Sequence, residues 1–314
     1  MNPEQQQHYL SNDIIRDFIR EKKSARRWKN FRFLIILIVI GMVLGGVFSQ
    51  AENGTMMGDA NHGYVSLVYL DGMIGPGQDF SARNVLPLLE KAFSDKNAKG
   101  VILDINSGGG TPVQAGIIHD AILRLKNKYH KKVIVVGEDM LASGAYYVAV
   151  AADKIYVNEN GITGSIGVIM KDFGFVDLIK KVGVERRVYT SGANKDRLDP
   201  FLPQTPSDVE KIRQVIGEIH TNFKNVVEAG RKGKLKDQSG DLFSGDFWSG
   251  PTAVKLGLID GLGDLSSVLQ NEFHVSAYKD YSEQPSFMKN VLSQVSLSLG
   301  TMLGQNDVRV MEKL

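Results

Sequence analysis

The chain has 314 residues, of which 43% are hydrophobic and 23% charged, and its formal net charge at pH 7 is +2. This length and balance are typical of a folded globular protein, and so small a net charge favours neither a nucleic-acid partner nor a disordered acidic chain. The sequence contains no cysteine, which excludes disulfides, thiolate nucleophiles and cysteine-based zinc sites.

An apolar run near the start predicts a membrane anchor. Residues 33–48 carry no polar side chain. The run is shorter than the roughly 20 residues of a typical spanning helix, but Phe31 lengthens it and Arg32 can extend its head group to the interface. We therefore expect one transmembrane helix at residues 33–50. A cleaved signal peptide is the main alternative, because residues 49–51 include small side chains at plausible cleavage positions.

Charge predicts the orientation of this anchor. Residues 1–32 form a basic segment whose lysines and arginines gather close to the apolar run, at Lys22, Lys23, Arg26, Arg27, Lys29 and Arg32. By the positive-inside rule, this segment stays in the cytoplasm and the chain after about Ala51 is exported. Residues 51–61 would then be a linker.

Residues 62–280 are expected to form one α/β domain. Short β-branched runs bounded by turn residues predict strands at 65–70, 101–105, 133–136 and 155–157. Helical patterns lie between them, including 85–93 and 112–128. Alternation of strand and helix at this spacing predicts a largely parallel sheet with right-handed crossovers.

A glycine-rich loop, Asn106 to Gly110, follows the second strand. Thr111 is expected to cap the next helix, with Pro112 in its first position and Gln114 completing a capping box. Such a loop points backbone N–H groups into open space, where they can hold an anion. It lacks the signatures of phosphate-binding and dinucleotide-binding loops, so those functions are disfavoured, while a purely structural turn remains the alternative.

Ser143 stands where the third strand gives way to a helix of small residues. Both Ser143 and the glycine loop follow the carboxyl ends of parallel strands, where functional groups gather. A serine hydroxyl beside free N–H donors supplies the nucleophile and the oxyanion hole of an acyl-transfer site. An ordinary helix N-cap is the alternative interpretation of this serine.

A nucleophilic serine also needs a base. The six histidines lie outside any motif and are expected to be ordinary solvated side chains: His8, His62, His119, His130, His220 and His274. A lysine can act instead if burial lowers its pKa from about 10.4 far enough to leave the amine neutral. Local pattern does not say which lysine would do this.

Five motifs together resemble the signal peptide peptidase A family in content and order: Asn106 to Gly110, Ala142 to Gly144, Thr163 to Val168, Ser191 to Asp196 with Pro200-Phe201, and Gly257 to Asp260. The resemblance covers about residues 62–270. It implies a Clp protease/crotonase-like fold and a homo-oligomeric ring. It also implies a serine endopeptidase that degrades cleaved signal peptides and other short apolar peptides on the periplasmic side of a bacterial inner membrane.

The resemblance also assigns the site residues. Ser143 would be the nucleophile, Lys195 the general base, and Ser165 a hydroxyl that orients the lysine amine. Backbone N–H groups of three glycines would form the oxyanion hole: Gly109, Gly110 and Gly144. The choice of Lys195 among the lysines rests on the resemblance alone. No cofactor, metal or nucleic acid is expected.

The chain departs from the family pattern at Gly108, where proline is usual and glycine gives the loop more conformational freedom, and at 245–248, where the family tends to carry arginine after glycine. Two other functions stay open, namely a crotonase-like acyl-CoA enzyme, which needs no serine–lysine pair, and an inactive membrane-anchored assembly protein.

A long amphipathic helix is expected at 207–232, opened by a capping box of Ser207 and Glu210. Residues 281–314 are expected to be a peripheral or flexible tail.

Overall fold

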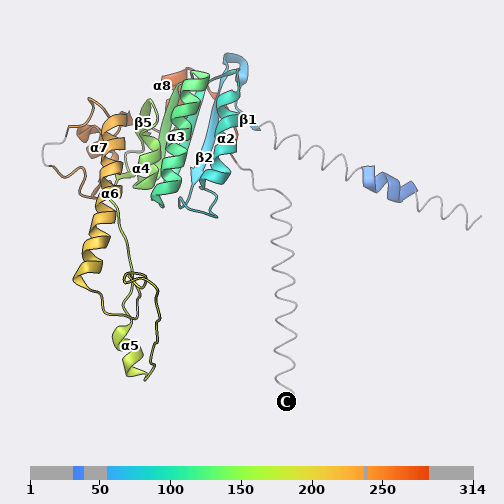
Figure 1. Cartoon of the computed structure of the whole chain (residues 1–314). Helices are drawn as coiled ribbons and strands as arrows, with labels where there is room; N and C mark the ends of the chain where they lie inside the picture. The colour runs from blue at the N-terminus through green and yellow to red at the C-terminus, as the bar shows by residue number, and fades with distance from the viewer. Residues whose placement is uncertain (1–30, 39–54, 237–239, 283–314) are drawn as a thin grey trace, which may run out of the picture. The chain divides into compact units, whose positions relative to one another are not determined.

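The computed structural model describes residues 31–38, 55–236 and 240–282 (Figure 1). The chain divides into two units, residues 1–55 and 56–314. In the first unit, residues 31–38 are helical with exposed side chains. Most of the basic segment, most of the predicted anchor and nearly all of the predicted tail lie outside the described residues. Within the described ranges, no helix has both the length and the apolar character needed to span a membrane.

The second unit is built on a nine-stranded, mostly parallel sheet with the order β1-β9-β2-β3-β4-β5-β8. The strands on this path are β1 Thr55–Met57, β2 Tyr64–Asp71, β3 Ala98–Ser107, β4 Val133–Ala142, β5 Lys154–Val157, β8 Gly261–Leu262 and β9 Ala277–Asp280. Off this path, β6 (Ile162–Gly164) pairs parallel with β4 and antiparallel with β7 (Phe247–Ser249). The predicted α/β class with a largely parallel sheet is confirmed.

Helices cover both faces of this sheet. In this second unit, a short 3-10 turn (η1) and seven helices are described: η1 Ala60–His62, α2 Ala82–Ser94, α3 Pro112–Tyr129, α4 Gly144–Ala149, α5 Val176–Lys181, α6 Pro206–Gly230, α7 Gly250–Leu256 and α8 Leu265–Phe273. In Figure 1, α2 and α3 lie side by side on one face, where they bury the larger apolar cluster with α4. The smaller cluster lies between the opposite face and α8. Strands buried on both faces explain the nearly continuous apolar runs of β3 and β4.

The start of α3 is where the sequence predicts it, but the predicted capping box is wrong. Thr111 occupies the N-cap position, yet its side chain makes no capping hydrogen bond. Gln114 Oε1 instead accepts a hydrogen bond from the backbone N–H of Ala82 at 2.9 Å. The glutamine therefore joins the first turn of α3 to the first residue of α2, a tertiary contact that competes with the local box.

The long helix α6 also begins with a different box from the one predicted. Thr205 is the N-cap, its hydroxyl accepts from the Asp208 N–H at 3.2 Å, and Asp208 Oδ2 accepts from the Thr205 N–H at 3.0 Å. Pro206 follows in the first helical position, where its fixed φ and missing N–H are favourable. The box expected from Ser207 and Glu210 is therefore wrong, because the helix begins before Ser207.

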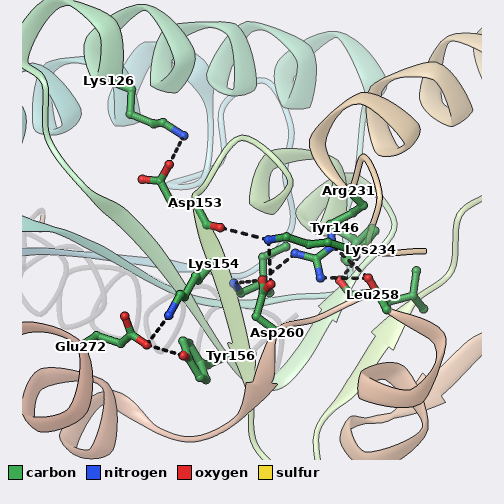
Figure 2. A network of polar contacts seen from close by, with 12 residues as sticks. Lys126, Tyr146, Asp153, Lys154, Tyr156, Arg231, Lys234, Leu258, Asp260 and Glu272 are labelled. Atoms are coloured by element: carbon green, nitrogen blue, oxygen red, sulfur yellow. Dashed lines mark hydrogen bonds and ion pairs between the residues drawn. The ribbon is translucent and has the colours of Figure 1, made fainter. Parts of the chain in front are cut away.

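A buried ion-pair network fixes the turn at 257–260 (Figure 2). Arg231, only 2% exposed, donates through Nε and Nη2 to the carbonyl of Gly257 and through Nη1 to Asp260 Oδ2 at 2.6 Å. Lys234 Nζ lies 2.7 Å from the other carboxylate oxygen. Burial acts to raise the pKa of Asp260, but hydrogen bonds from Arg231 and Lys234 hold it below its ordinary value. The network thus keeps Asp260 charged.

The same turn supports the helix that begins after Ser143. The buried Tyr146 of α4 donates its hydroxyl to the carbonyl of Leu258 at 2.6 Å (Figure 2). Because buried polar groups need partners, this bond ties the position of α4 to the turn at 257–260.

Candidate active site

The glycine loop and Ser143 lie against one another at the carboxyl ends of β3 and β4, which are parallel neighbours. A Cβ atom at Gly109 would stand 2.7 Å from the Ser143 Cβ and 2.6 Å from the Gly144 nitrogen. Gly109 also has φ +98°, which favours glycine. Only a residue without a side chain allows the loop to approach the serine so closely.

Ser143 itself has an unusual backbone conformation, with φ 52° and ψ −122°. Its N–H donates to the carbonyl of Gly164 at 2.8 Å, and its carbonyl accepts from Tyr147 in α4. Such a conformation costs a non-glycine residue on the order of 1–3 kcal/mol and is concentrated at functional sites. A sharp turn from strand through serine to helix is also how hydrolases present a nucleophile at the end of a sheet.

Two backbone N–H groups beside Ser143 have no acceptor among the described residues. Gly109 and Thr111 are held to Ile74, whose N–H donates to Gly109 and whose carbonyl accepts from Thr111, both at 2.9 Å. Between them, the N–H of Gly110 has no acceptor in the part of the chain that the structure describes, and the same is true of Gly144. The two groups are close together, since a Cβ at Gly144 would lie 3.1 Å from the Gly110 nitrogen. They can stabilise a negative oxygen.

The third predicted donor is already used. The N–H of Gly109 donates to the buried Ser107 Oγ at 3.1 Å. Gly109 therefore contributes close approach rather than a free donor. Asn106, the residue before Ser107, also supports the site, because its Oδ1 accepts from the Met140 N–H at 3.2 Å. Ser107 thus holds the conformation of the glycine loop, and Asn106 holds the loop against β4.

A cavity of about 110 Å³ opens in front of Ser143. Its lining combines the loop with mostly apolar side chains from α3, α4, α6 and the segment after Ser165: Gly110, Pro112, Ala115, Ser143, Gly144, Tyr147, Gly167, Val168, Ile169, Ile219, Asn222 and Phe223. Tyr147 packs on Phe223 with ring centroids 5.1 Å apart. The sequence did not predict that α6 lines this cavity, because the apolar stripe of that helix indicates core packing or a subunit interface instead.

Ser165 directly follows β6, the strand that pairs with the end of β4 just before Ser143. In the parallel register of β4 and β6, Ala142 is opposite Gly164, so the two serines follow at the same end of neighbouring strands. Ser165 is half-buried, has φ 51°, and donates its N–H to the carbonyl of Asp246 at 2.7 Å. Both serines therefore have a positive φ just beyond the carboxyl ends of neighbouring strands.

Lys195 lies elsewhere in the single chain. It is exposed, in a turn between α5 and α6, and is not among the described residues that line the Ser143 cavity. It belongs to residues 169–204, called the arm, which starts at Ile169 in the cavity wall and includes α5, drawn in Figure 1 at the end of α6 remote from the sheet. The structure thus brings Ser143, Ser165 and the glycine loop together but leaves Lys195 apart.

Two histidines differ from the expectation of solvated side chains, and one of them, the half-buried His220, has its Nε2 3.2 Å from the carbonyl oxygen of Ile166. His119 is only 7% exposed, its Nδ1 is 2.9 Å from Asp120 Oδ1, and its ring meets the edge of Tyr147 at 5.3 Å between centroids. The prediction that it is solvated is wrong, because α3 turns this position toward α4. His119 does not line the cavity, as far as the described residues show.

Comparisons with known proteins identify the family. The family model for peptidase family S49 matches residues 125–276, a range that contains Ser143, Ser165 and Lys195. A candidate protease of Methanocaldococcus jannaschii is 32% identical over 246 residues, which cover 76% of this chain and 78% of that protein. A candidate signal peptide peptidase SppA of Enterococcus faecium is 32% identical over 186 residues, 59% of this chain and 54% of the relative.

A third relative carries an unrelated name. The Na(+)/H(+) antiporter NhaA of Brucella abortus is 47% identical over 214 residues, 67% of this chain but only 29% of the antiporter. The chain thus spans well under two thirds of that protein and of the Enterococcus relative. The family match and the extended similarity to the archaeal protease show that the chain belongs to peptidase family S49, the signal peptide peptidase A family of serine proteases.

Proposed function

We propose that this protein is a serine endopeptidase in which Ser143 attacks the peptide carbonyl. The observation that carries the proposal is the strained turn of Ser143 beside the free N–H groups of Gly110 and Gly144. The hydroxyl oxygen would form a bond to the carbonyl carbon, and the two N–H groups would hold the resulting oxyanion. Departure of the amine leaves an acyl-enzyme, which water then hydrolyses.

We assign the general base to Lys195, with Ser165 orienting its amine. A neutral lysine amine would take the proton of Ser143 and return it to the leaving amine, and the same pair would then activate water. A neutral amine requires burial, whereas Lys195 is exposed in the single chain. The proposal therefore requires the arm to carry Lys195 into a covered position when the working enzyme assembles.

The surface of the arm supports such an assembly. Its apolar side chains include many that are exposed: Ile169, Met170, Phe173, Leu178, Val182, Val184, Tyr189 and Leu198. A group of exposed apolar side chains of this size is typical of an interaction surface. We propose that the arm packs in a homo-oligomeric ring, where burial of these side chains would also cover Lys195.

The proposed substrates are short apolar peptides, including cleaved signal peptides. The walls of the Ser143 cavity are mostly apolar, and its volume of about 110 Å³ suits small side chains. The proposed location is the periplasmic side of a bacterial inner membrane, with residues 33–50 as a single-pass anchor. This location would place the enzyme beside the membrane in which signal peptides remain after cleavage.

Hydrolysis of a fluorogenic apolar peptide tests the proposal. Ser143→Ala should lower kcat at least about 1,000-fold, because the nucleophile is lost while the fold is kept. Ser94→Ala is the matched control, since Ser94 is exposed at the end of α2 and its hydroxyl donates to the carbonyl of Lys91 in the same helix. Full activity of Ser143→Ala would overturn the proposal, and turnover of an acyl-CoA by that variant would support a crotonase-like enzyme instead.

A further inference from the structure

A second and larger hollow, of about 590 Å³, lies on the sheet face covered by α8. Among the described residues, none lines both this hollow and the Ser143 cavity. Its lining is notable for four carboxyl groups and two tyrosines: Asp104, Glu138, Asp139, Asp264, Tyr69 and Tyr278. No lysine, arginine or histidine of the described ranges lines it. The hollow is thus strongly acidic without a cation of its own.

Asp104 is the central feature of this hollow. It belongs to β3, where alternation places its side chain on the same face as Ile102, toward α8. Asp104 is 4% exposed, and its Oδ1 has no hydrogen-bond partner among the described residues. An unpartnered buried carboxyl oxygen is unfavourable and rare, so its presence in a cavity wall indicates a missing donor.

The charged groups around Asp104 indicate that the missing hydrogen-bond donor is a cation. Burial, followed by the charges of Glu138 and Asp264, raises the pKa of Asp104 to about 7. Asp264 cannot supply a proton, because hydrogen bonds from the Ser267 backbone and hydroxyl hold its pKa below the ordinary range. A positive charge in the hollow would remove this repulsion and favour the carboxylate.

The shape of the lining favours an organic cation over a metal ion. Within the described residues, no three acidic or histidine side chains converge closely enough to hold a metal. The ring of Tyr69, directly opposite Asp104 in the register of β2 and β3, and the ring of Tyr278 can instead contact a larger cation. A volume of about 590 Å³ accommodates an extended side chain or a small diamine.

We propose that this hollow binds an alkylammonium or guanidinium group, whose N–H donors bond to Asp104 Oδ1 and whose charge is balanced by Glu138, Asp139 and Asp264. The ligand is a basic side chain of a peptide or a free organic cation. Because its lining is separate from the Ser143 cavity, this binding is independent of the proposed peptidase chemistry.

Calorimetric titration of the full chain tests the proposal with two cationic probes. Agmatine represents a free cation, and N-acetyl-arginine amide represents a basic side chain in a peptide. N-acetyl-norleucine amide is the neutral control. Wild type should bind at least one cationic probe saturably and should not bind the neutral one. The probe that binds more tightly shows whether the natural ligand is a free organic cation or a basic side chain of a peptide.

Two variants make the test specific. Asp104→Asn keeps the shape of the side chain but removes its charge. It should raise the Kd of the cationic probe at least about tenfold, as expected for loss of a charge-assisted hydrogen bond. Glu210→Gln removes an exposed carboxylate of α6, outside the hollow. Its Kd for the cationic probe should stay within about twofold of the wild-type value.

The proposal is overturned if neither cationic probe binds saturably, if Asp104→Asn binds as tightly as wild type, or if the neutral probe binds equally well. Displacement of the probe by calcium at equal concentration would likewise contradict an organic-cation site. Peptide hydrolysis, measured on the same samples, should be unchanged in Asp104→Asn. This measurement distinguishes failure of the proposed cation site from failure of the proposed role of Ser143.

Discussion

Gly109 and Ser143 are so close that a methyl group on the first would stand 2.7 Å from the Cβ of the second. This contact joins the loop after β3 to the turn after β4, and the free N–H of Gly110 lies in that loop. The geometry of the proposed oxyanion hole therefore depends on a residue whose own N–H is bonded to Ser107.

Gly109→Ala should lower kcat by about 100-fold or more, because relief of the collision moves the Gly110 donor away from Ser143. Gly108→Ala is the matched control. The nearest atom to a Cβ at Gly108 is the flexible Met140 Cε at 3.4 Å, so this variant should remain active. Steady-state hydrolysis, with circular dichroism to verify folding, measures both. Equal activity of the two variants would show that the loop contact is unimportant.

Mixing of two inactive variants tests how Lys195 reaches Ser143. Ser143→Ala and Lys195→Ala should each be inactive alone, because each lacks one partner. We expect a co-assembled mixture to regain part of the activity, since Lys195 lies outside the cavity of its own chain and a neighbouring arm can supply it. The control is Ser143→Ala mixed with the double variant. No recovery from a mixture shown to co-assemble would contradict delivery between copies.

Asp104→Asn should stabilise the protein increasingly as pH rises. The pKa of Asp104 is raised to about 7 in the folded state, so folding favours the protonated acid. The pKa of an aspartate in the unfolded chain is about 4. The free energy of unfolding therefore falls as pH rises from about 4 through 7, by about 4 kcal/mol in all. The Tm difference between variant and wild type should therefore grow from pH 4 to pH 8. A difference that is constant with pH, or that shrinks, would contradict this assignment.

Arg231→Met should destabilise the fold by about 3 kcal/mol, because it removes the buried donors to Gly257 and Asp260. Lys234→Met, which removes the more exposed partner of Asp260, should cost about 1 kcal/mol or less. Since the pKa of Asp260 is lowered, the contribution of this pair is present above about pH 4 and is lost as pH falls further. Urea denaturation at pH 7 measures both variants, and equal effects would contradict the network.

Local pattern in the sequence was enough to predict the central part of this fold. The β-branched runs of β2 to β5 and the apolar stripes of α2 and α3 identify those elements, and the residues after β3 and β4 meet because parallel neighbours end together. Short elements such as β6 and β8 carry too few residues for a pattern. Their positions depend on pairing with β4 and β5.

Other features depend on contacts between distant residues and could not be predicted locally. Gln114 has the spacing of a capping box but bonds to Ala82 instead. His119 resembles a surface residue until Tyr147 packs against it. Asp104 interrupts an apolar strand without any local sign that its carboxyl faces a hollow. The cavity walls from α6 likewise follow from how that helix packs beside α4.

The most direct test of the central claim is to identify the residue that becomes acylated. The protein is incubated with an apolar peptide ester, quenched in acid and digested, and the fragments are weighed by mass spectrometry. The account predicts one acyl adduct, on the fragment that contains Ser143, and no adduct in Ser143→Ala. Continued hydrolysis with no adduct at Ser143, or with an adduct on a different residue, would contradict it.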